Sequence, residues 1–339
     1  MTTTRTVPDV LRRARELVAV PLRASVDRLS DEVRRLVEYH LGYVDQYGRP
    51  ESNGSGGKGV RPALAILSAE AAGCPAAAGI PGAVSVELVH NFSLLHDDVI
   101  DCDRERRHRA TVWALFGIGP AIIAGDALLA LAQEIVLEAP AGGSEAGRCL
   151  AEATGAMING QALDMAFETA PSVDVDSCIT MEAGKTGALL GCASSIGAVL
   201  CGAKPEVVSA LKEFGIQLGL AFQAVDDLLG IWGDPETTGK PAWSDLRQHK
   251  KTLPVTAALA AGDSAAAELA SLLHNEHLDE AQVARAAHLV ELCGGRAIAM
   301  DEARGRLAAA LASLDSVPLE PSAGRELREV AGFVVAREF

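Results

Sequence analysis

The stretch LLHDDVID occupies residues 94–101 and joins two leucines to a histidine and three carboxylates. Residues four apart lie on one face of a helix, so Asp97 and Asp101 would stack there with Asp98 beside them. Carboxylates at that spacing repel each other, and next to an apolar run they must be solvated, protonated or neutralised. A hard divalent cation such as Mg²⁺ neutralises oxygen ligands well, so the stretch is either a metal-binding helix end or a solvated one.

A second stretch of the same character, FQAVDDLL, occupies residues 222–229. An acidic pair embedded among leucines is hard to explain as solvated surface. The two acidic pairs begin 129 positions apart, at Asp97 and Asp226, so each would lie on its own helix. We expect them to face each other across a helical bundle and to hold metal ions between them.

The composition predicts an all-α protein built as a single large helical bundle. Hydrophobic residues make up 49% of the 339-residue chain, enough for a large core, whereas aromatic residues make up only 4%. The abundance of Ala, Leu, Val and Glu suits helices better than many short strands. We expect one domain over residues 1–339, with residues 1–8 disordered and residues 45–59 forming a flexible, glycine-rich loop.

The spacing of apolar residues predicts the individual helices. Pro21 would divide the amphipathic region over residues 10–41 into two helices, because proline removes a helix hydrogen bond. Further helices are expected at residues 62–72, 82–100, 119–137, 146–167, 180–200 and 214–232, followed by an Ala-rich helical region over residues 253–339. Lys58 and Arg61 precede or open the first of these, where backbone donors and the helix dipole favour an anion.

Charge and cysteine content exclude several classes of function. The net charge of −15 argues against nucleic-acid binding, and it requires that any phosphate ester be held by metal ions and a few well-placed cations. Seven scattered cysteines without a C-x-x-C pair indicate a reducing cytosol. Residues 1–13 contain no apolar export segment, and no run of 18 uncharged apolar residues occurs, so we expect a cytoplasmic protein without a transmembrane segment.

Cations recur at intervals along the chain, at Lys58, Arg61, Arg106, Arg107, Lys185, Lys240 and Lys250. Carboxylates, Mg²⁺ and such cations together are what a diphosphate leaving group requires, because ions already in place stabilise the charge that builds on the departing oxygens. No nucleophilic triad, Walker loop or G-x-G-x-x-G loop is evident. The residues therefore indicate ionisation of a diphosphate ester.

Five short motifs follow one another along the chain: GGKGVRP at 56–62, DDVID at 97–101, RR at 106–107, KT at 185–186 and DD at 226–227. With these segments in this order, from about residue 56 to 254, the sequence resembles the trans-prenyltransferases of the polyprenyl synthetase family. Among them, it is similar to the geranylgeranyl diphosphate synthases. The resemblance implies an all-α isoprenoid synthase fold with a central substrate cavity. It also implies a homodimer.

The same resemblance assigns metal ligands. Asp97 and Asp101 would bind Mg²⁺ directly, with Asp98 in the same metal site. Asp226, with Asp227 beside it, would bind a third Mg²⁺. Three Mg²⁺ per active site would then hold the allylic diphosphate.

The resemblance further assigns the residues that bind diphosphate. Those expected at the isopentenyl diphosphate site are Lys58, Arg61 and His90. Arg106 and Arg107 would serve one substrate diphosphate each. Further diphosphate-binding residues are Lys185, Thr186, Gln223, Lys240 and Lys250, although Thr186 and Gln223 could also be ordinary hydrogen bonders between helices. The residues given catalytic roles are Asp97, Asp101, Asp226, Arg106 and Lys185.

The implied reaction is a head-to-tail condensation. The C–O bond of an allylic diphosphate (dimethylallyl, geranyl or farnesyl) breaks, and the double bond of isopentenyl diphosphate attacks the resulting cation. The released pyrophosphate takes the leaving proton, which agrees with the absence of an evident protein base in the sequence.

Two residues ahead of the first acidic cluster bear on product length. Phe92 and Ser93 would lie just over one helical turn, roughly 6 to 7 Å, below the metal ions and form a floor beneath the growing tail. One aromatic residue with a small neighbour resembles enzymes that make geranylgeranyl diphosphate. We expect that C20 product, with the C15 farnesyl diphosphate next.

Some residues depart from the family pattern. Gly230 stands where the second acidic motif usually ends in another Asp, His108 and His249 stand where glycine is common, and Ala110 stands where proline is common. Two alternatives therefore stay open: a class I terpene cyclase of the same fold, and a non-catalytic subunit of a hetero-oligomeric prenyltransferase. Lys58, Arg61 and His90 argue against the cyclase, and the retained aspartates argue against the subunit.

Overall fold

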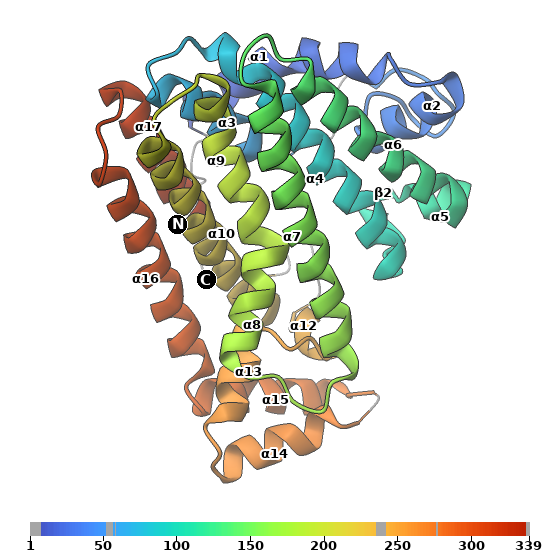
Figure 1. Ribbon diagram of the computed structural model, residues 1–339. Helices are drawn as coiled ribbons and strands as arrows, with labels where there is room; N and C mark the ends of the chain where they lie inside the picture. Colours follow the sequence, from blue (N-terminus) through green and yellow to red (C-terminus); the bar gives the residue numbers. More distant parts are fainter. Residues whose placement is uncertain (1–7, 52–56, 58, 235–241, 276, 337–339) are drawn as a thin grey trace. The chain divides into compact units, whose positions relative to one another are not determined.

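The computed structural model describes residues 8–51, 57, 59–234, 242–275 and 277–336. Most of these residues are helical (Figure 1), which confirms the all-α prediction. The chain divides into two compact units: unit 1 comprises Met1–Thr154, Cys192–Lys212 and Val317–Val330, and unit 2 comprises Gly155–Gly191, Glu213–Ser316 and Ala331–Phe339. Whether they fold as the single domain expected from the sequence stays a prediction.

Unit 1 is built mainly from the N-terminal helices. Their bounds are α1 Asp9–Val26, α2 Asp31–His40, α3 Val60–Ala71, the 3₁₀ turn η1 Ala76–Gly79, α4 Ile80–Ile100, α5 Val112–Phe116 and α6 Ile118–Leu137. The central helix α4 packs against both α3 and α6. The helices α7 (Gly143–Thr169), α9 (Ala188–Leu200), α10 (Pro205–Trp232) and α17 (Pro321–Val335) contribute residues to both units.

Unit 2 contains the remaining helices: α8 Val175–Glu182, α12 Ser244–Arg247, α13 Leu253–Ala260, α14 Ser264–Leu273, α15 Glu280–Leu292 and α16 Gly295–Asp315. Between α8 and α9 lies η2, a π-helical segment over Ala183–Gly187. Leu228 of α10 is completely buried beside Cys178 of α8 and Leu253 of α13, so these elements form one part of the core of unit 2.

Close helix packing in unit 1 depends on small residues. The N–H of Gly197 in α9 donates to Ser68 Oγ of α3 at 2.9 Å. A Cβ atom at residue 197 would lie 2.2 Å from the carbonyl oxygen of Ala65. The Ala65 oxygen belongs to the backbone and Ser68 is fully buried, so neither can move aside for a side chain at residue 197. Glycine is therefore required where α9 crosses α3.

Residues 10–41 form two helices as predicted, but the prediction that Pro21 divides them was wrong. Helix α1 continues through Pro21 to Val26, and the break comes at Asp27–Ser30. The buried residues on one face of α1 include Val18 before the proline and Val26 after it. A proline inside a helix costs about 3 kcal/mol, and here the apolar face buried beyond it offsets that cost.

The helices expected at 62–72, 82–100, 119–137 and 146–167 are confirmed within three residues at each end. The helix expected at 214–232 ends as predicted but begins nine residues earlier, at Pro205, and the helix expected at 180–200 begins at Val175. Two local features were not predicted: the π-helical turn within the helix expected at 180–200, and a short hairpin of β1 (Glu105–Arg106) and β2 (Arg109–Ala110). In the loop expected over residues 45–59, the described part begins with a turn in which Asp45 Oδ1 accepts the N–H groups of Tyr47 and Arg49.

Three described helical segments are long and apolar enough to cross a membrane, judged by length and composition alone. They are Ile118–Leu137, Val175–Leu200 and Pro205–Trp232, and 39%, 72% and 61% of their most apolar windows are buried within the protein. The second and third are therefore mostly core helices, whereas Ile118–Leu137 leaves much of its apolar surface uncovered. The expected absence of a transmembrane segment stays a prediction.

Candidate active site

The first acidic cluster lies at the C-terminal end of α4, as the sequence predicts. Asp97 and Asp98 occupy the last turn, and Asp101 caps the helix. The N–H of Asp101 donates to the carbonyl oxygen of Asp97 at 2.8 Å, and the Asp101 side chain is exposed. Negative charge at this end opposes the helix dipole, so a bound cation would offset an electrostatic cost.

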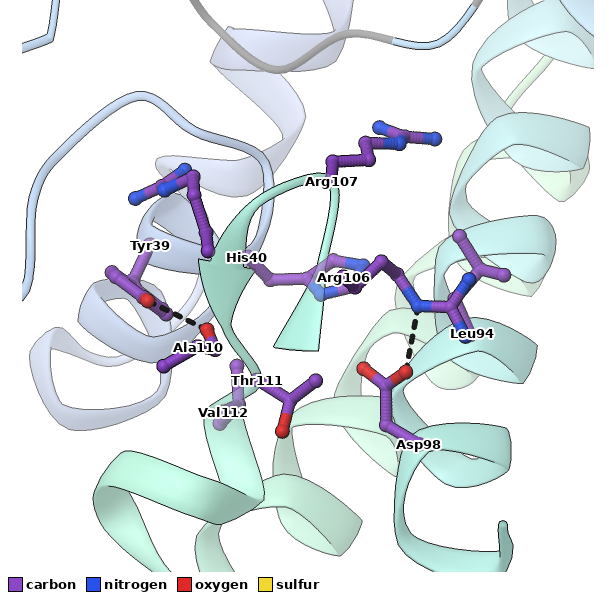
Figure 2. Close-up of a pocket in the computed structure, with 10 residues that line it drawn as sticks. Tyr39, His40, Leu94, Asp98, Arg106, Arg107, Ala110, Thr111 and Val112 are labelled. Carbon is purple, nitrogen blue, oxygen red and sulfur yellow. Dashed lines mark hydrogen bonds and ion pairs between the residues drawn. The ribbon is translucent and has the colours of Figure 1, made fainter. Parts of the chain in front are cut away.

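Asp98 differs from its two neighbours because it is buried, with 2% of its surface exposed. Its Oδ1 accepts a hydrogen bond from Arg106 Nε at 2.6 Å, and Figure 2 shows the arginine reaching α4 from the hairpin. Burial raises the pKa of Asp98, and the charge of Arg106 opposes that rise. The metal role expected for Asp98 stays a prediction, but its contact with Arg106 gives it a positioning role.

The hairpin carries the paired arginines in different directions. Arg106 is directed toward Asp98, whereas the guanidinium of Arg107 lies 3.1 Å from the point where a Cβ atom of Gly57 would be. The hairpin is fixed to α2 by Tyr39, whose hydroxyl donates to the carbonyl oxygen of Ala110 at 2.6 Å. The structure thus brings Arg107 to the glycine-rich segment that precedes α3.

A basic cavity lies beside the hairpin (Figure 2). Its lining comes from α2, α4 and the hairpin region, and consists of Tyr39, His40, Leu94, Asp98, Arg106, Arg107, Arg109, Ala110, Thr111 and Val112. Three arginines and one carboxylate give it a positive balance. Such a cavity can hold an anion without a metal ion.

Two histidines in and near this cavity are kept neutral by their surroundings. His40 Nε2 lies 3.1 Å from Asn91 Oδ1, and burial together with the charges of Arg106 and Arg107 lowers the pKa of His40 to about 3. Burial, with the nearby charge of Arg61, likewise lowers the pKa of His90 well below its usual value. Neutral histidines here can donate hydrogen bonds to an anion without adding charge. His40 was not predicted, because only the fold brings α2 beside α4.

Arg61 is the strongest sign of an anion site in unit 1. Its Nε is shielded from solvent and has no hydrogen-bond partner among the described residues. Burial lowers the pKa of Arg61, and the neighbouring Glu87 partly offsets this. A buried donor without a partner is costly, so an oxyanion bound there would satisfy it. Lys58, expected at the same site, lies outside the described residues.

The second acidic cluster lies on α10 in unit 2. Asp227 is buried, and both of its oxygens accept hydrogen bonds: Oδ1 from Gln223 Nε2 at 2.8 Å and Oδ2 from the N–H of Leu253 at 2.9 Å. Thr186 Oγ1 donates to Gln223 Oε1 at 2.8 Å. Thr186 and Gln223 therefore do bond helix to helix. The other member of the acidic pair, Asp226, lines a cavity of unit 2.

The π-helical segment sets the positions of Lys185 and Thr186. A Cβ atom at Gly160 of α7 would lie 2.2 Å from the backbone nitrogen of Lys185, so the two backbones touch. One turn along α7, Asp164 forms an ion pair with the ammonium of Lys185. π-helical segments are rare and occur often at functional sites, which agrees with the expected role of Lys185.

A second buried acid accompanies Asp227. Glu182 is 3% exposed, and burial together with the charge of Asp227 raises its pKa well above the usual value. Burial also raises the pKa of Asp227 to about 7. The thiol of Cys178 donates to Glu182 Oε1 at 3.4 Å. Sequence reasoning missed Glu182, because nothing in its apolar helix distinguishes it before α10 is placed beside it.

The cavity of unit 2 brings together most of the remaining predicted residues. It is lined by Asp164, Met181, Glu182, Lys185, Thr186, Gln223, Asp226, Asp227, Asp245, Lys250, Lys251 and Thr252. Lys250 therefore lies in the same cavity as Lys185, and its diphosphate-binding role stays a prediction, whereas Lys240 lies outside the described residues. Asp245 was not predicted as a site residue.

The proposed chain-length residues lie one turn before the first acidic cluster. The ring of Phe92 is 6% exposed and meets the ring of His96 edge to face, with centroids 4.8 Å apart. Ser93 Oγ donates to the carbonyl oxygen of His90 at 2.9 Å. Their role in setting product length stays a prediction.

Comparison with known proteins identifies the family to which the chain belongs. A family model described as polyprenyl synthetase matches residues 51–290. The chain belongs to the polyprenyl synthetase family. Its fold is that of a crystal structure of a polyprenyl synthetase from Streptomyces coelicolor A3(2), with a TM-score of 0.93, 50% sequence identity, and coverage of 98% of this chain and 100% of the other.

Two curated relatives come from Mycobacterium tuberculosis. A (2E,6E)-farnesyl diphosphate synthase is 48% identical over 99% of this chain and 94% of its own length. A geranylgeranyl diphosphate synthase is 42% identical over 92% of this chain and 90% of its own length. The protein is accordingly a prenyltransferase with short-chain isoprenyl diphosphate synthase activity.

Two departures from the family pattern have a structural explanation. His108 and His249, which stand where glycine is common, have left-handed φ angles of 60° and 54°. Glycine adopts this conformation without strain, and histidine tolerates it better than most residues do. At His108 the conformation closes the two-residue hairpin turn after Arg107, whose φ is 53°.

The carboxylates fit the metal dependence of the family. Among the described residues, no three His, Cys, Asp or Glu side chains converge as a preformed metal cage. Mg²⁺ is usually held by one or two carboxylates together with water and substrate phosphates, so the half-buried Asp97 and the exposed Asp101 suit it. Asp226, which faces a cavity with cationic neighbours, also suits it.

Proposed function

We propose that this synthase joins isopentenyl diphosphate to an allylic diphosphate in a Mg²⁺-dependent head-to-tail condensation that releases pyrophosphate. The allylic substrate is dimethylallyl, geranyl or farnesyl diphosphate. The new carbon–carbon bond forms when the double bond of isopentenyl diphosphate attacks the allylic cation. Each turnover lengthens the chain by five carbons.

The unsatisfied Nε of Arg61 in unit 1 is the observation that supports this proposal most directly. Arg61, His90 and Arg107 provide an anion site whose positive charge comes from the protein itself. The acidic clusters can bind a diphosphate only through metal ions. Two chemically different kinds of site fit two diphosphate substrates, with isopentenyl diphosphate in the basic one.

The remaining residues act on the allylic diphosphate. Asp97, Asp101 and Asp226 would hold three Mg²⁺, which stabilise the charge on the leaving diphosphate when they are bound. Arg106, held in place by Asp98, and Lys185 would donate hydrogen bonds to diphosphate oxygens. The proton lost from the new chain passes to the released pyrophosphate.

Product length is the finer part of the proposal. We propose geranylgeranyl diphosphate as the product, because the small Ser93 beside Phe92 leaves room for a longer tail. Farnesyl diphosphate is the second candidate, and the 48% identical farnesyl diphosphate synthase of Mycobacterium tuberculosis supports it.

We also propose a homodimer in the cytoplasm. The resemblance implies the dimer, and α6 leaves the apolar side chains of Ile118, Ile123 and Leu137 more than half exposed. A second copy of the chain could cover this face. Light scattering after gel filtration would measure the assembly directly, and a monomer at micromolar concentration would contradict it.

One incubation tests reaction and product together. Purified protein is supplied with isopentenyl diphosphate, each allylic diphosphate in turn and Mg²⁺, and the products are dephosphorylated and identified. A C20 or C15 alcohol would support the proposal. A cyclic hydrocarbon formed from one allylic substrate alone would identify a terpene cyclase, and no turnover at high Mg²⁺ would favour a non-catalytic subunit.

The variant Phe92→Ala tests the floor. We expect longer products, because the truncated side chain opens space beneath the tail. Ser93→Ala serves as a control that leaves the floor in place. An unchanged product distribution in Phe92→Ala would show that the tail is limited elsewhere.

A further inference from the structure

The thiols of Cys149 on α7 and Cys192 on α9 face each other within unit 1. Their Sγ atoms lie 3.6 Å apart, at hydrogen-bonding distance for sulfur. Cys149 is partly exposed, whereas Cys192 is completely buried. Neither residue lines either of the two cavities described above, so the pair is separate from the residues of the candidate active site.

The packing of α7 on α9 holds the two thiols opposite each other. At Gly142, just before α7, an added Cβ atom would lie 2.8 Å from the carbonyl oxygen of Val199 in α9, so the two backbones touch there. Cys149 follows Gly142 by seven residues. Cys192 precedes Val199 by the same number, so each thiol lies about two helical turns from that contact and the two helices run antiparallel between them. Rotation of the side chains alone can therefore bring the sulfurs to bonding distance.

The two thiols differ in reactivity. The hydrogen bond between them lowers the pKa of Cys149 to about 7, so its thiolate is well populated at neutral pH. The charge of Lys212 also favours this thiolate, and the charge of Glu152 opposes it. The same hydrogen bond, together with burial, raises the pKa of Cys192 well above its usual value. An accessible thiolate beside a second, buried thiol is the arrangement found in redox-sensing cysteine pairs.

We propose that Cys149 and Cys192 are a redox modification site at which hydrogen peroxide forms a disulfide between α7 and α9. The thiolate of Cys149 attacks one peroxide oxygen and the O–O bond breaks. The leaving hydroxide takes up the proton that the thiol has lost and departs as water. The sulfur of Cys192 then attacks the sulfenic acid on Cys149, and the sulfenic hydroxyl leaves with the Cys192 proton as a second water. The two sulfurs together lose two electrons, which reduce the peroxide.

The disulfide protects Cys149 from irreversible oxidation. A sulfenic acid that meets no thiol is oxidised further to a sulfinic acid, which thiol reductants do not restore. Cys192 intercepts the sulfenic acid because it already lies beside it. Disulfides in a reducing compartment are usually transient, which suits a bond that forms under peroxide and is then reduced. This inference does not depend on the proposed function, because neither thiol is assigned a role in the reaction.

Mass spectrometry of the full chain after peroxide treatment tests the inference. We expect the loss of two hydrogens, and a tryptic cross-link between the peptide that begins at Cys149 and the peptide over residues 186–212, which fragmentation places at Cys192. Dithiothreitol should reverse both changes. The melting temperature of the oxidised protein should rise by about 5 °C, because the new bond closes a loop in the unfolded chain.

Two variants separate the pair from the other thiols. In Cys192→Ala, Cys149 should gain one and then two oxygen atoms, and dithiothreitol should not restore the doubly oxidised form. Cys201→Ala is the matched control, because it removes a thiol that follows α9 and interacts with Cys74 instead. In this control the disulfide between Cys149 and Cys192 should form as in the unaltered protein.

Two results on the unaltered protein would overturn the inference. One is a cross-link that joins Cys149 to a cysteine other than Cys192, and the other is a stable sulfinic acid on Cys149 without any cross-link. A melting temperature that falls on oxidation would also contradict it, because the packing of α7 on α9 would then have to be distorted to form the bond. These measurements decide even if Cys192→Ala does not fold.

Discussion

Replacing Asp98 with Asn would show whether this buried acid binds metal or positions Arg106. Asn has nearly the same shape and keeps an acceptor oxygen, but it removes the charge that pairs with Arg106 Nε at 2.6 Å. A hydrogen bond to a charged group contributes about 1.5–3 kcal/mol, against about 0.5–1.5 kcal/mol for a neutral one. The expected loss is therefore about 1–2 kcal/mol.

Two features of the pair keep the loss at that modest level. The Arg106 side chain is 30% exposed, so water partly replaces the lost partner. The pKa of Asp98 is raised by burial, so removing its charge also removes a desolvation cost. We expect the free energy of unfolding to fall by about 1–2 kcal/mol, and KM for diphosphate substrates to rise because Arg106 loses the charged partner that orients it.

Urea unfolding, steady-state kinetics and Mn²⁺ titration on the same samples measure these effects. Asp97→Asn is the matched control on the neighbouring residue of α4. It should lower kcat and Mn²⁺ affinity while leaving stability nearly unchanged, because its carboxylate is not buried as Asp98 is. Our reasoning would be refuted if Asp98→Asn weakened Mn²⁺ binding as much as Asp97→Asn did without any loss of stability.

Three further predictions concern stability and reactivity. Gly197→Ala should lower the free energy of unfolding by about 3 kcal/mol in a urea titration, since its Cβ would meet a backbone oxygen of α3 at 2.2 Å, whereas Gly305→Ala, which meets nothing within 4 Å, should not destabilise. Because the folded pKa of His40 is about 3 and the ordinary value is 6.5, the unfolded state binds more protons as the pH falls, so His40 should lower stability below pH 6.5 by up to about 1.4 kcal/mol per pH unit. His90, whose pKa is also lowered, adds to this slope, so His40→Asn should reduce the slope by the His40 share, and an unaltered slope would contradict the low pKa of His40. The hydrogen bond between the thiols of Cys149 and Cys192 lowers the pKa of Cys149 to about 7, so alkylation of Cys149 should reach half its maximal rate near pH 7 and shift to higher pH in Cys192→Ala. The same profile in both proteins would refute the coupling.

The parts of the fold that depend on apolar periodicity could be predicted from the sequence. Helix α4 was expected to end at residue 100 and does so, because its apolar pattern runs up to the acidic cluster. The path of α1 through Pro21 could not be predicted, since it depends on which face of the helix the rest of unit 1 covers. The hairpin at Arg106 was missed because its two strands have two residues each, too few to form a pattern.

Some residues of the candidate site could be predicted from the sequence, and others could not. Charged residues in apolar or glycine-rich surroundings, such as Asp226 and Arg61, stand out in the sequence because their burial would be costly. His40, Glu182 and Asp245 do not stand out, because what distinguishes them is a neighbour distant in the chain. Gly230 appeared from the sequence as a missing carboxylate, and the structure shows the space it leaves filled from another helix.

The π-helical turn at Ala183–Gly187 has a consequence for deletions in the gene. A π-helical turn holds one residue more than an α-helical turn, and each residue corresponds to a rotation of about 100° around the helix axis. Deleting one codon in this turn would restore a regular helix but turn α9 away from α3, where Gly197 meets Ser68. A frame-preserving deletion of one codon here should therefore be as damaging as a substitution of Lys185 itself.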